Sequence, residues 1–270
     1  MVERSPLHDL GGTTVDIPTH ASHTSNDPPC ALITGATSGI GRAFVHQLVA
    51  EGYDVIAVAR THSDLEQLDA RPLPADLSTH LGITTVVREL ETRQVDVLIN
   101  CAGFGVRTST LDTPVDQLTA QSMVMNEAVR TLSWHAAKRM VARGRGGIVN
   151  VTSLAAVTTQ GTYAAEKAAA TVFTESLAHD LRGTPVTCTA VLPGFVSTEF
   201  HQRMGVGREF PDCVWMEPAE VARIALRDAR ADKTISVPGV GYQVLYALSQ
   251  VTPRPLMRAL SGGFQWKRTR

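Results

Sequence analysis

The chain has 270 residues, of which 43% are hydrophobic and 19% charged, and its formal net charge is −1. This length suits one large α/β domain, and the composition is typical of a globular protein that buries a sizeable core. A nearly neutral chain has no overall electrostatic attraction to nucleic acid or to acidic partners, which excludes those function classes as a first hypothesis.

The cysteines lie far apart in the sequence and form no C-x-x-C pair; they are Cys30, Cys101, Cys188 and Cys213. This spacing predicts neither a metal knuckle nor a disulfide framework, so we expect a reducing setting. The N-terminus lacks the basic-then-apolar pattern of a secretory signal, and no run approaches the ~18 apolar residues of a membrane span. We therefore expect a cytoplasmic protein without a bound metal.

Residues 1–27 are rich in Thr, Ser, His, Asp, Pro and Gly, and Pro28-Pro29 closes the segment. So little apolar surface does not offset the entropy of ordering a chain, which predicts a flexible tail. His8, His20 and His23 are interpreted as solvated side chains and not as metal ligands, because nothing in such a segment fixes their geometry.

From residue 30 the chain alternates short apolar runs with segments of helical periodicity. We predict strands at 30–34, 54–60, 95–103, 146–153, 186–194 and 233–238, with a further strand before Asp76. We predict helices at 39–52, 78–92, 114–143, 161–182 and 217–230. Such alternation predicts an α/β fold with a doubly wound, Rossmann-like parallel sheet, covered by helices on both faces.

No repeat or linker divides residues 30–260, so we predict a single domain over 28–253, with a basic C-terminal tail at 254–270. The irregular stretch at 199–216 combines Gly205, Gly207 and Pro211 with scattered apolar residues. This mixture suits a mobile lid over an apolar pocket, and an ordinary surface connection is the alternative.

The sequence "TGATSGIG" follows the first predicted strand and contains Gly35, Gly39 and Gly41. Glycines let the backbone approach a phosphate closely, and a helix that begins here directs free N–H groups and the positive end of its dipole at a pyrophosphate. The position between the first strand and the first helix favours a nucleotide site over a purely structural turn.

Arg60 follows the second predicted strand, where a dinucleotide fold meets the adenosine ribose. A carboxylate there binds a free 2′-hydroxyl, whereas a cation pairs with a 2′-phosphate, so Arg60 favours NADP(H) over NAD(H). Asp76, in "PADLS", is expected to cap the next helix or to contact adenine.

Several further motifs follow in order, and together they resemble the short-chain dehydrogenase/reductase family over about residues 30–240. "NCAG" at 100–103 is similar to the N-N-A-G motif of the family, with Cys101 in place of its second Asn. "NVTS" at 150–153 resembles the strand end that carries its serine, "YAAEK" its Y-x-x-x-K motif, and "PGFVST" at 193–198 its P-G motif. Asn126 matches its helix asparagine.

The resemblance implies catalytic roles for four residues. Tyr163 is the expected general acid for carbonyl reduction, or the base for alcohol oxidation. Lys167 is expected to hold the nicotinamide ribose, Ser153 to bind the substrate oxygen, and Asn126 to help hold a water that relays protons to Lys167. The implied cofactor contacts, beside Tyr163 and Lys167, are Gly35, Thr37, Ser38, Gly39, Ile40, Gly41, Arg60, Asp76, Leu77, Asn100, Ala102, Gly103, Pro193, Gly194, Val196 and Thr198.

Positions i and i+4 share one face of a helix, so Tyr163 and Lys167 should point into one site. A free tyrosine has a pKa of about 10, and a nearby ammonium is expected to lower that pKa toward the range useful in acid–base catalysis.

Thr152 is the alternative to Ser153 as the hydroxyl residue at this strand end. Ser153 and Tyr163 are ten positions apart, about three fewer than is common in the family; the short loop either admits bulkier substrates or misplaces Ser153.

The function that follows is an NADP(H)-dependent oxidoreductase that interconverts a carbonyl and an alcohol on a hydrophobic small molecule. The alternative is a catalytically silent sensor or scaffold protein that keeps NADP(H) binding.

The resemblance also implies a homo-oligomer that pairs through the helices beginning near 114 and 161. Residues 254–270 carry five basic and no acidic residues beside Phe264 and Trp266, which suits contact with a membrane surface, a solvated tail or an oligomer contact.

Overall fold

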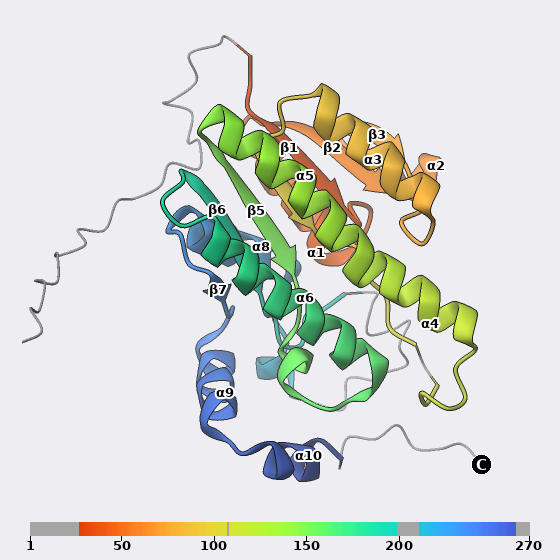
Figure 1. Ribbon diagram of the computed structural model, residues 1–270, viewed down its shortest axis with the longest axis vertical. Helices are drawn as coiled ribbons and strands as arrows, with labels where there is room; N and C mark the ends of the chain where they lie inside the picture. Colours follow the sequence, from red (N-terminus) through yellow and green to blue (C-terminus); the bar gives the residue numbers. More distant parts are fainter. Residues whose placement is uncertain (1–26, 107, 199–210, 263–270) are drawn as a thin grey trace, which may run out of the picture.

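The structure is a computed structural model that describes residues 27–106, 108–198 and 211–262. Its centre is a seven-stranded parallel sheet with the order β3-β2-β1-β4-β5-β6-β7 (Figure 1). The strands are β1 (Cys30–Thr34), β2 (Asp54–Ala59), β3 (Arg71–Pro74), β4 (Val97–Asn100), β5 (Gly146–Val151), β6 (Val186–Val191) and β7 (Ile235–Ser236).

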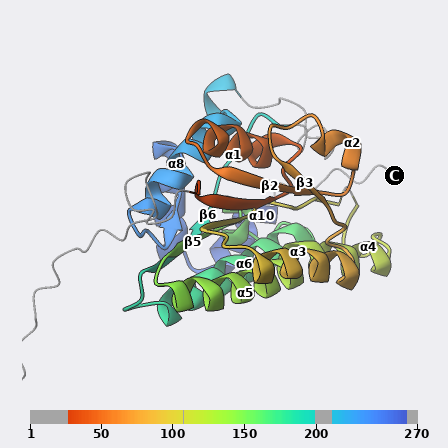
Figure 2. The ribbon, with the colours of Figure 1, turned by 90° about the horizontal axis from the view of Figure 1, so that it is seen from above.

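Helices cover both faces of this sheet, as Figure 2 shows with the sheet between two helical layers. The helical elements are α1 (Gly39–Ala50), α2 (His62–Leu65), α3 (His80–Thr92), α4 (Val115–Ser122), the π-helix η1 (Met123–Glu127), α5 (Ala128–Arg143), the 3-10 turn η2 (Leu154–Val157), α6 (Gly161–Asp180), the 3-10 turn η3 (Asp212–Val214), α8 (Pro218–Arg230), α9 (Val240–Val251) and α10 (Arg254–Gly262). Helices α1 and α8 lie on one face, and α3, α5 and α6 lie on the other. The predicted doubly wound α/β fold is confirmed.

The five residues of β1 are all buried, as are all six of β5 and all six of β6. Continuous apolar strands of this kind are stable only where helices cover both faces of the sheet. Strand β1 pairs with β2 on one side and with β4 on the other, so the chain changes direction along the sheet between β1 and β4. Ligands of open parallel sheets bind beyond the carboxyl ends of the strands at such a point.

The ends of several elements differ from the sequence prediction. Strand β4 stops at Asn100, although we predicted a strand to residue 103. The reason is that the backbone N–H groups of Cys101 and Ala102 donate to the Thr34 hydroxyl, at 3.0 and 3.1 Å, and so leave the ladder. The predicted helix 114–143 is divided by the π-helical turn η1 into α4 and α5.

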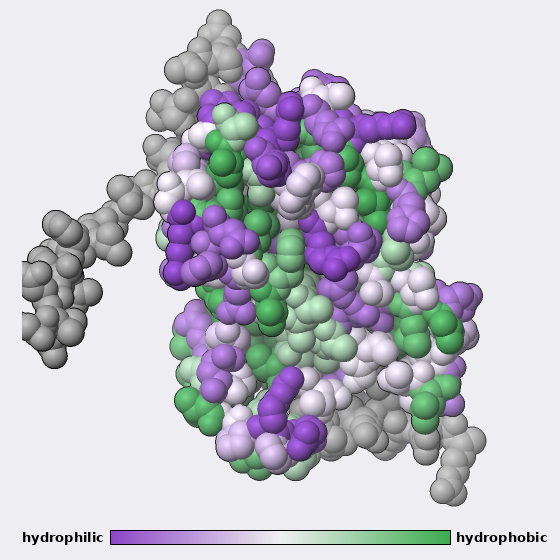
Figure 3. Space-filling view, viewed as in Figure 1, coloured by the Kyte–Doolittle hydropathy of each residue, from purple (hydrophilic) through white to green (hydrophobic). Residues whose placement is uncertain are grey.

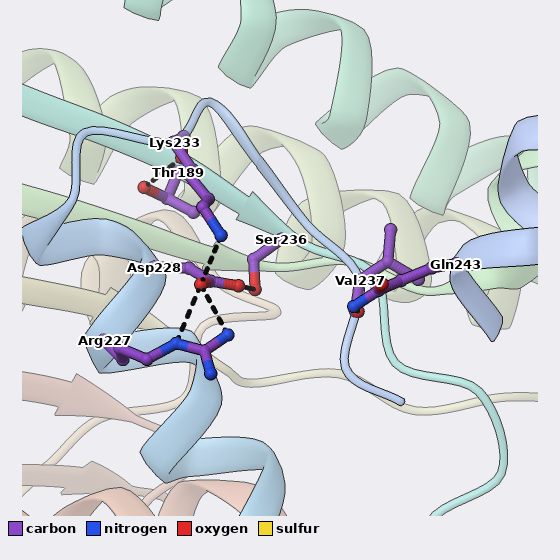
Figure 4. A network of polar contacts seen from close by, with 7 residues as sticks. All are labelled: Thr189, Arg227, Asp228, Lys233, Ser236, Val237 and Gln243. Carbon is purple, nitrogen blue, oxygen red and sulfur yellow. Dashed lines mark hydrogen bonds and ion pairs between the residues drawn. The ribbon is translucent and has the colours of Figure 1, made fainter. Parts of the chain in front are cut away.

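Helix α8 is joined to the edge strand β7 by the network in Figure 4. Asp228 on α8 is 3% exposed, and its carboxylate accepts hydrogen bonds from three side chains, those of Arg227, Lys233 and Ser236. Burial alone would raise the pKa of Asp228, but these hydrogen bonds outweigh burial and lower it. The network therefore holds the last strand, and the helix that follows it, against the body of the domain.

Two segments named in the sequence analysis lie largely beyond the described ranges. Residues 199–210 of the expected lid are not described, whereas 211–216 contain η3 and a parallel bridge between Val196 and Met216. The N-terminal segment is described only from residue 27, so His8, His20 and His23 are outside the description. The C-terminal segment begins with α10.

Candidate active site

The glycine turn between β1 and α1 is closely packed around its own backbone. Gly35 and Gly39 have φ values of +67° and +50°, which favour glycine. A Cβ at Gly41 would lie 2.0 Å from the Gly35 carbonyl oxygen, and one at Gly39 would lie 2.9 Å from Cγ2 of Thr198. The turn thus forms a narrow cradle at the start of α1 in which no side chain fits at Gly35, Gly39 or Gly41, and this shape fits the pyrophosphate of a dinucleotide.

The other residues of the turn also lie at or next to the start of α1. Ser38 occupies the N-cap position of α1 with extended backbone, but its side chain makes no cap hydrogen bond. Thr37 is partly buried in the turn itself, and Ile40, in the first turn of the helix, packs against the core. Backbone N–H groups at this helix start are therefore the donors that the turn offers to an anion.

The Asn100–Gly103 segment leaves β4 beside this cradle. Asn100 is buried, and its side-chain amide donates to Ser133 at 3.1 Å and to Asn150 at 2.9 Å. Asn150 in turn donates to Thr174 at 2.9 Å. This buried row of polar groups links β4 and β5 to α5 and α6, so the Asn100 side chain is engaged inside the protein and supports the cofactor site through the backbone.

The end of this segment approaches Lys167 of helix α6. A Cβ at Gly103 would lie 3.5 Å from Nζ of Lys167. A Cβ at Gly35 would lie 2.8 Å from Cα of Ala102, so Ala102 lines the glycine turn. Burial raises the pKa of Cys101 to about 12, and Lys167 opposes this effect. The Cys101 thiol is therefore neutral and inert, as expected for a small buried residue.

Arg60 is exposed directly after β2, at the same edge of the sheet. Asp76, after β3, accepts hydrogen bonds from the backbone N–H of Ser78 at 2.9 Å and from its hydroxyl at 2.7 Å. These bonds, and then the nearby charge of Arg60, lower the pKa of Asp76. Thr79, not Asp76, is the N-cap of α3, and the neighbouring Leu77 is buried.

Helix α6 carries Tyr163 and Lys167 on one face. Lys167 is 6% exposed, its Nζ lies 5.8 Å from the centre of the Tyr163 ring, and it donates to the Val151 carbonyl at 2.7 Å. Burial lowers the pKa of Lys167 to about 8, and the neighbouring Cys101 opposes this shift. Lys167 is therefore a buried ammonium whose position is fixed by the Val151 carbonyl, and it does not form an exposed helical pair with Tyr163.

The expected lowering of the Tyr163 pKa is wrong for this structure. Burial raises the pKa of Tyr163 to about 12, a hydrogen bond with Ser153 opposes that rise, and Cys101 adds to it. The Lys167 ammonium donates to the Val151 carbonyl and lies 5.8 Å from the centre of the Tyr163 ring, and burial outweighs any effect of its charge on the Tyr163 pKa. Tyr163 is therefore a neutral phenol over the ordinary pH range, suited to donate a proton.

The structure brings Ser153 to Tyr163 despite the short loop between them. Ser153 hydrogen-bonds Tyr163 and accepts a bond from the Ala155 N–H at 3.1 Å, which starts the turn η2. Its rival Thr152 is 2% exposed, and its hydroxyl donates to the Val191 carbonyl of β6 at 3.0 Å. Of these two hydroxyls, it is therefore the one of Ser153 that lies beside the Tyr163 phenol.

Asn126 sits in the π-helical turn η1, a distortion that often marks functional sites. Its side-chain amide donates to the carboxylate of Glu166, the residue before Lys167. Burial raises the pKa of Glu166, and a hydrogen bond from Ser122 opposes this effect. Asn126 also lines a hollow of about 520 Å³ on the outer side of η1. Glu166 was not identified in the sequence analysis, since its spacing resembles a solvated helix position.

The P-G segment follows β6 and lies against the glycine turn through Thr198. Pro193 and Val196 are buried, and Val196 bridges to Met216. A Cβ at Gly194 would lie 2.1 Å from Cζ of Tyr242, so the tyrosine ring covers this glycine.

Tyr242 of α9 is a residue that sequence reasoning missed. Its hydroxyl accepts from the Phe195 N–H at 3.0 Å and donates to the Val214 carbonyl at 2.6 Å. It thus joins the P-G segment to the stretch before α8. No local sequence pattern predicts this contact between Tyr242 and the P-G segment, because Tyr242 lies 48 positions beyond Gly194 in a segment that we did not predict to be helical.

Across residues 27–106, 108–198 and 211–262, no group of three or more His, Cys, Asp or Glu side chains is arranged to hold a metal ion. Among the helices so described, none combines the length and the apolar character needed to cross a bilayer.

Comparison with known proteins gives consistent matches. The short chain dehydrogenase family profile matches residues 29–209. The chain is 34% identical over 235 residues to the short-chain reductase protein NovJ of Streptomyces niveus, covering 78% of this chain and 88% of that protein. It is 31% identical over 227 residues to galactitol 2-dehydrogenase (L-tagatose-forming) of Cereibacter sphaeroides, covering 74% and 87%.

Solved structures agree with these relatives. A short-chain dehydrogenase from Sphingobium yanoikuyae in complex with NADPH has a TM-score of 0.76 and 25% sequence identity, covering 85% of this chain and 95% of that one.

Proposed function

Because this chain belongs to the short-chain dehydrogenase/reductase family and is thus an NAD(P)-dependent oxidoreductase acting on CH–OH groups, we propose that it uses NADP(H) to interconvert a hydrophobic carbonyl compound and its alcohol. The observation that carries the proposal is the meeting of Tyr163, Ser153 and Lys167 beside the glycine cradle. The cofactor, when bound, supplies or accepts the hydride.

The protein's own residues supply the proton and the geometry. Ser153 orients the substrate oxygen, and Tyr163, a neutral phenol with a pKa of about 12, donates its proton as negative charge develops there. Lys167, whose ammonium donates to the Val151 carbonyl, contributes a fixed positive charge that favours the phenolate left behind, and it would hold the ribose hydroxyls of the bound cofactor. Asn126, in the π-helical turn beside α6, helps to hold a water that returns the proton.

The preference for NADP(H) rests on Arg60, which is exposed after β2 where a 2′-phosphate would lie. A guanidinium pairs with phosphate through charge-assisted hydrogen bonds, and the residue that follows β2 at the ribose position is Arg60 and not a carboxylate. The NADPH complex of the Sphingobium yanoikuyae enzyme supports this assignment.

The preference for a hydrophobic substrate rests on apolar side chains next to Ser153 in sequence and at the P-G motif. Leu154 directly follows Ser153, and the ring of Phe195, within the P-G motif, lies 5.3 Å from the ring of Trp215. The short loop between Ser153 and Tyr163 leaves room for bulky substituents on the carbonyl.

The proposal also includes a cytoplasmic homo-oligomer that pairs through the outer face of α5 and α6. Trp134 on α5 is 55% exposed and Val172 on α6 is 65% exposed, so this face presents apolar side chains to a second copy.

The test is NADPH oxidation with a panel of aromatic, aliphatic and steroid-like carbonyl compounds by the wild type and by Tyr163→Phe. Loss of the phenol removes the proton donor, so we expect kcat to fall by about 10²–10⁴-fold. NADPH binding, followed by fluorescence, should change little because the ring remains.

Thr152→Val is the matched control, since it removes a neighbouring hydroxyl that is bonded to β6. We expect this variant to retain most of the wild-type kcat, and Ser153→Ala to lose most of it. Equal rates for wild type and Tyr163→Phe would overturn the mechanism, and tight NADPH binding without turnover on the whole panel would favour a silent binding protein.

A further inference from the structure

Helix α9 presents an uncovered apolar stripe on the surface of the molecule. Its sequence, VGYQVLYALSQV, contains no charged residue, and none of its residues is buried. Val240, Val244, Leu248 and Val251 recur at helical spacing on one side and are 77%, 55%, 55% and 78% exposed. Leu245, 58% exposed, widens the stripe. Isolated apolar residues on a surface are ordinary, but a contiguous stripe indicates a partner.

The opposite side of α9 attaches the helix to the domain. Tyr242 and Tyr246 pack against the small core cluster that contains Leu192 and Val237, and Gln243 donates to the Val237 carbonyl at 3.0 Å (Figure 4). The stripe therefore faces away from the body. Figure 1 shows α9 and α10 extending beyond β7 at the end of the sheet, outside the two helical layers. We call α9 and α10 together the C-terminal arm.

The C-terminal arm lies in a segment of the chain whose charged side chains are all positive. No Asp or Glu occurs from residue 233 to residue 270, and the cations in this range are Lys233, Arg254, Arg258, Lys267, Arg268 and Arg270. The whole chain has a net charge of −1, so six positive charges here leave −7 for residues 1–232. Such separation of charge within a chain points to an anionic partner for this end of the molecule.

Helix α10 places these charges beside apolar groups. Arg254 and Arg258 are one turn apart and exposed, and Leu256 between them is 51% exposed. Figure 3 shows apolar side chains and hydrophilic ones next to each other in this region of the surface. A stripe without charges, flanked by cations, matches the boundary of an anionic bilayer, where acyl chains meet phosphate groups.

We propose that the C-terminal arm docks on anionic lipid, with the stripe of α9 at the acyl boundary and the arginines of α10 at the phosphates. A second copy of the arm is a poorer partner, because contact between two arms sets positive charge against positive charge. The docking itself is independent of the proposed function. If that function holds, Tyr242 connects the docked helix to Gly194 and so places the substrate site next to the bilayer, where hydrophobic carbonyl compounds dissolve.

The test is flotation of the full-length protein with vesicles of phosphatidylcholine alone and of phosphatidylcholine mixed with phosphatidylglycerol. We expect binding to the mixed vesicles at low salt and its loss at high salt, since the anionic surface attracts the arm electrostatically. The double variant Val244→Asp/Leu248→Asp should reduce binding by about tenfold or more, because the stripe no longer enters the boundary. Arg254→Glu/Arg258→Glu should have the same effect.

Leu81→Asp is the matched control, as Leu81 is an apolar residue on α3 that is 76% exposed and distant in sequence from the arm. It should leave vesicle binding unchanged, and NADPH oxidation should be unchanged in all of these variants. The proposal is overturned if the wild type binds neither vesicle, if it binds both equally, or if the arm variants still float. A change in sedimentation velocity of Val244→Asp/Leu248→Asp without any vesicle binding of the wild type would instead assign the stripe to a second copy.

Discussion

Lys167 carries its charge in a place with little water, and this sets the pH range of the enzyme. Burial lowers its pKa to about 8, so the ammonium predominates below that pH and is lost above it. The pH dependence of kcat/KM reports groups of the free enzyme. We expect kcat/KM for carbonyl reduction to fall as the pH rises through about 8, measured by NADPH oxidation in a series of buffers.

Lys167→Arg separates this residue from other titrating groups, because a guanidinium keeps its charge throughout this range. The decline near pH 8 should disappear from the profile of the variant, whatever its absolute rate. An unchanged midpoint in Lys167→Arg would show that another group is responsible. Tyr163 is a poor candidate, since burial raises its pKa to about 12.

The meeting of Tyr163 and Lys167 on one helix face was predictable, but their pKa values were not. The i, i+4 spacing of Tyr163 and Lys167 determines that they share a helix face, whatever surrounds them. Their pKa values depend on burial by residues from several elements and on the direction of the Lys167 side chain, which Val151 fixes. Similarly, two contacts that the sequence does not show decide in favour of Ser153: its hydrogen bond with Tyr163 and the bond of Thr152 to β6.

At the scale of elements, α9 supports the P-G segment from outside the region of family resemblance. Tyr242→Phe keeps the ring over Gly194 and removes the hydrogen bonds to Phe195 and Val214. Since each net hydrogen bond contributes about 0.5–1.5 kcal/mol, we expect NADPH affinity to fall by about threefold to tenfold. Titration of NADPH fluorescence measures this change, and kcat at saturating NADPH should change less.

Tyr246→Phe is the control, because Tyr246 lies one turn later on the same helix and its hydroxyl has no such bond in the described part of the chain. It should bind NADPH as the wild type does. Equal loss of affinity in both variants would mean that the tyrosines act through the packing of α9 and not through the Phe195 and Val214 backbone.

The observed helices and strands agree with the predicted ones where the apolar periodicity of the sequence is strong. The strand at 30–34 and the helix starting at 39 are found as predicted, because their patterns need no distant partner. The π-helical turn at Met123–Glu127 interrupts a helix whose sequence shows no breaker. Helix α9 was not predicted, since without a charged residue its sequence does not distinguish an exposed side from a buried one.

At the scale of the whole molecule, the hydrogen bonds of Asp228 hold strand β7 in place and so contribute to the free energy of unfolding of the domain. Asp228→Asn removes a buried charge that three donors satisfy, and we expect the free energy of unfolding to fall by about 1–3 kcal/mol near neutral pH. The folded pKa of Asp228 lies below its ordinary value of 3.8. Its stabilisation is therefore present above that value and is lost as the pH falls through the folded pKa.

Thermal unfolding followed by circular dichroism measures the difference between wild type and Asp228→Asn at several pH values. The difference should be largest near neutral pH and should shrink as the pH falls below the ordinary value of 3.8 and through the lowered pKa of the folded state. Asp180→Asn, at an exposed position at the end of α6, is the control and should unfold like the wild type. A difference that stays constant with pH would show that the carboxylate charge has no part in it.

A gene duplicate of this chain would have two unequal routes to losing catalysis. Replacing Tyr163 with Phe removes a single hydroxyl and leaves the fold intact, whereas a side chain at Gly41 would place its Cβ 2.0 Å from the Gly35 carbonyl oxygen. Selection for a folded chain therefore preserves the nucleotide turn even after the chemistry is gone. A catalytically inert descendant is expected to remain a dinucleotide-binding protein, because folding itself requires the shape that receives the pyrophosphate.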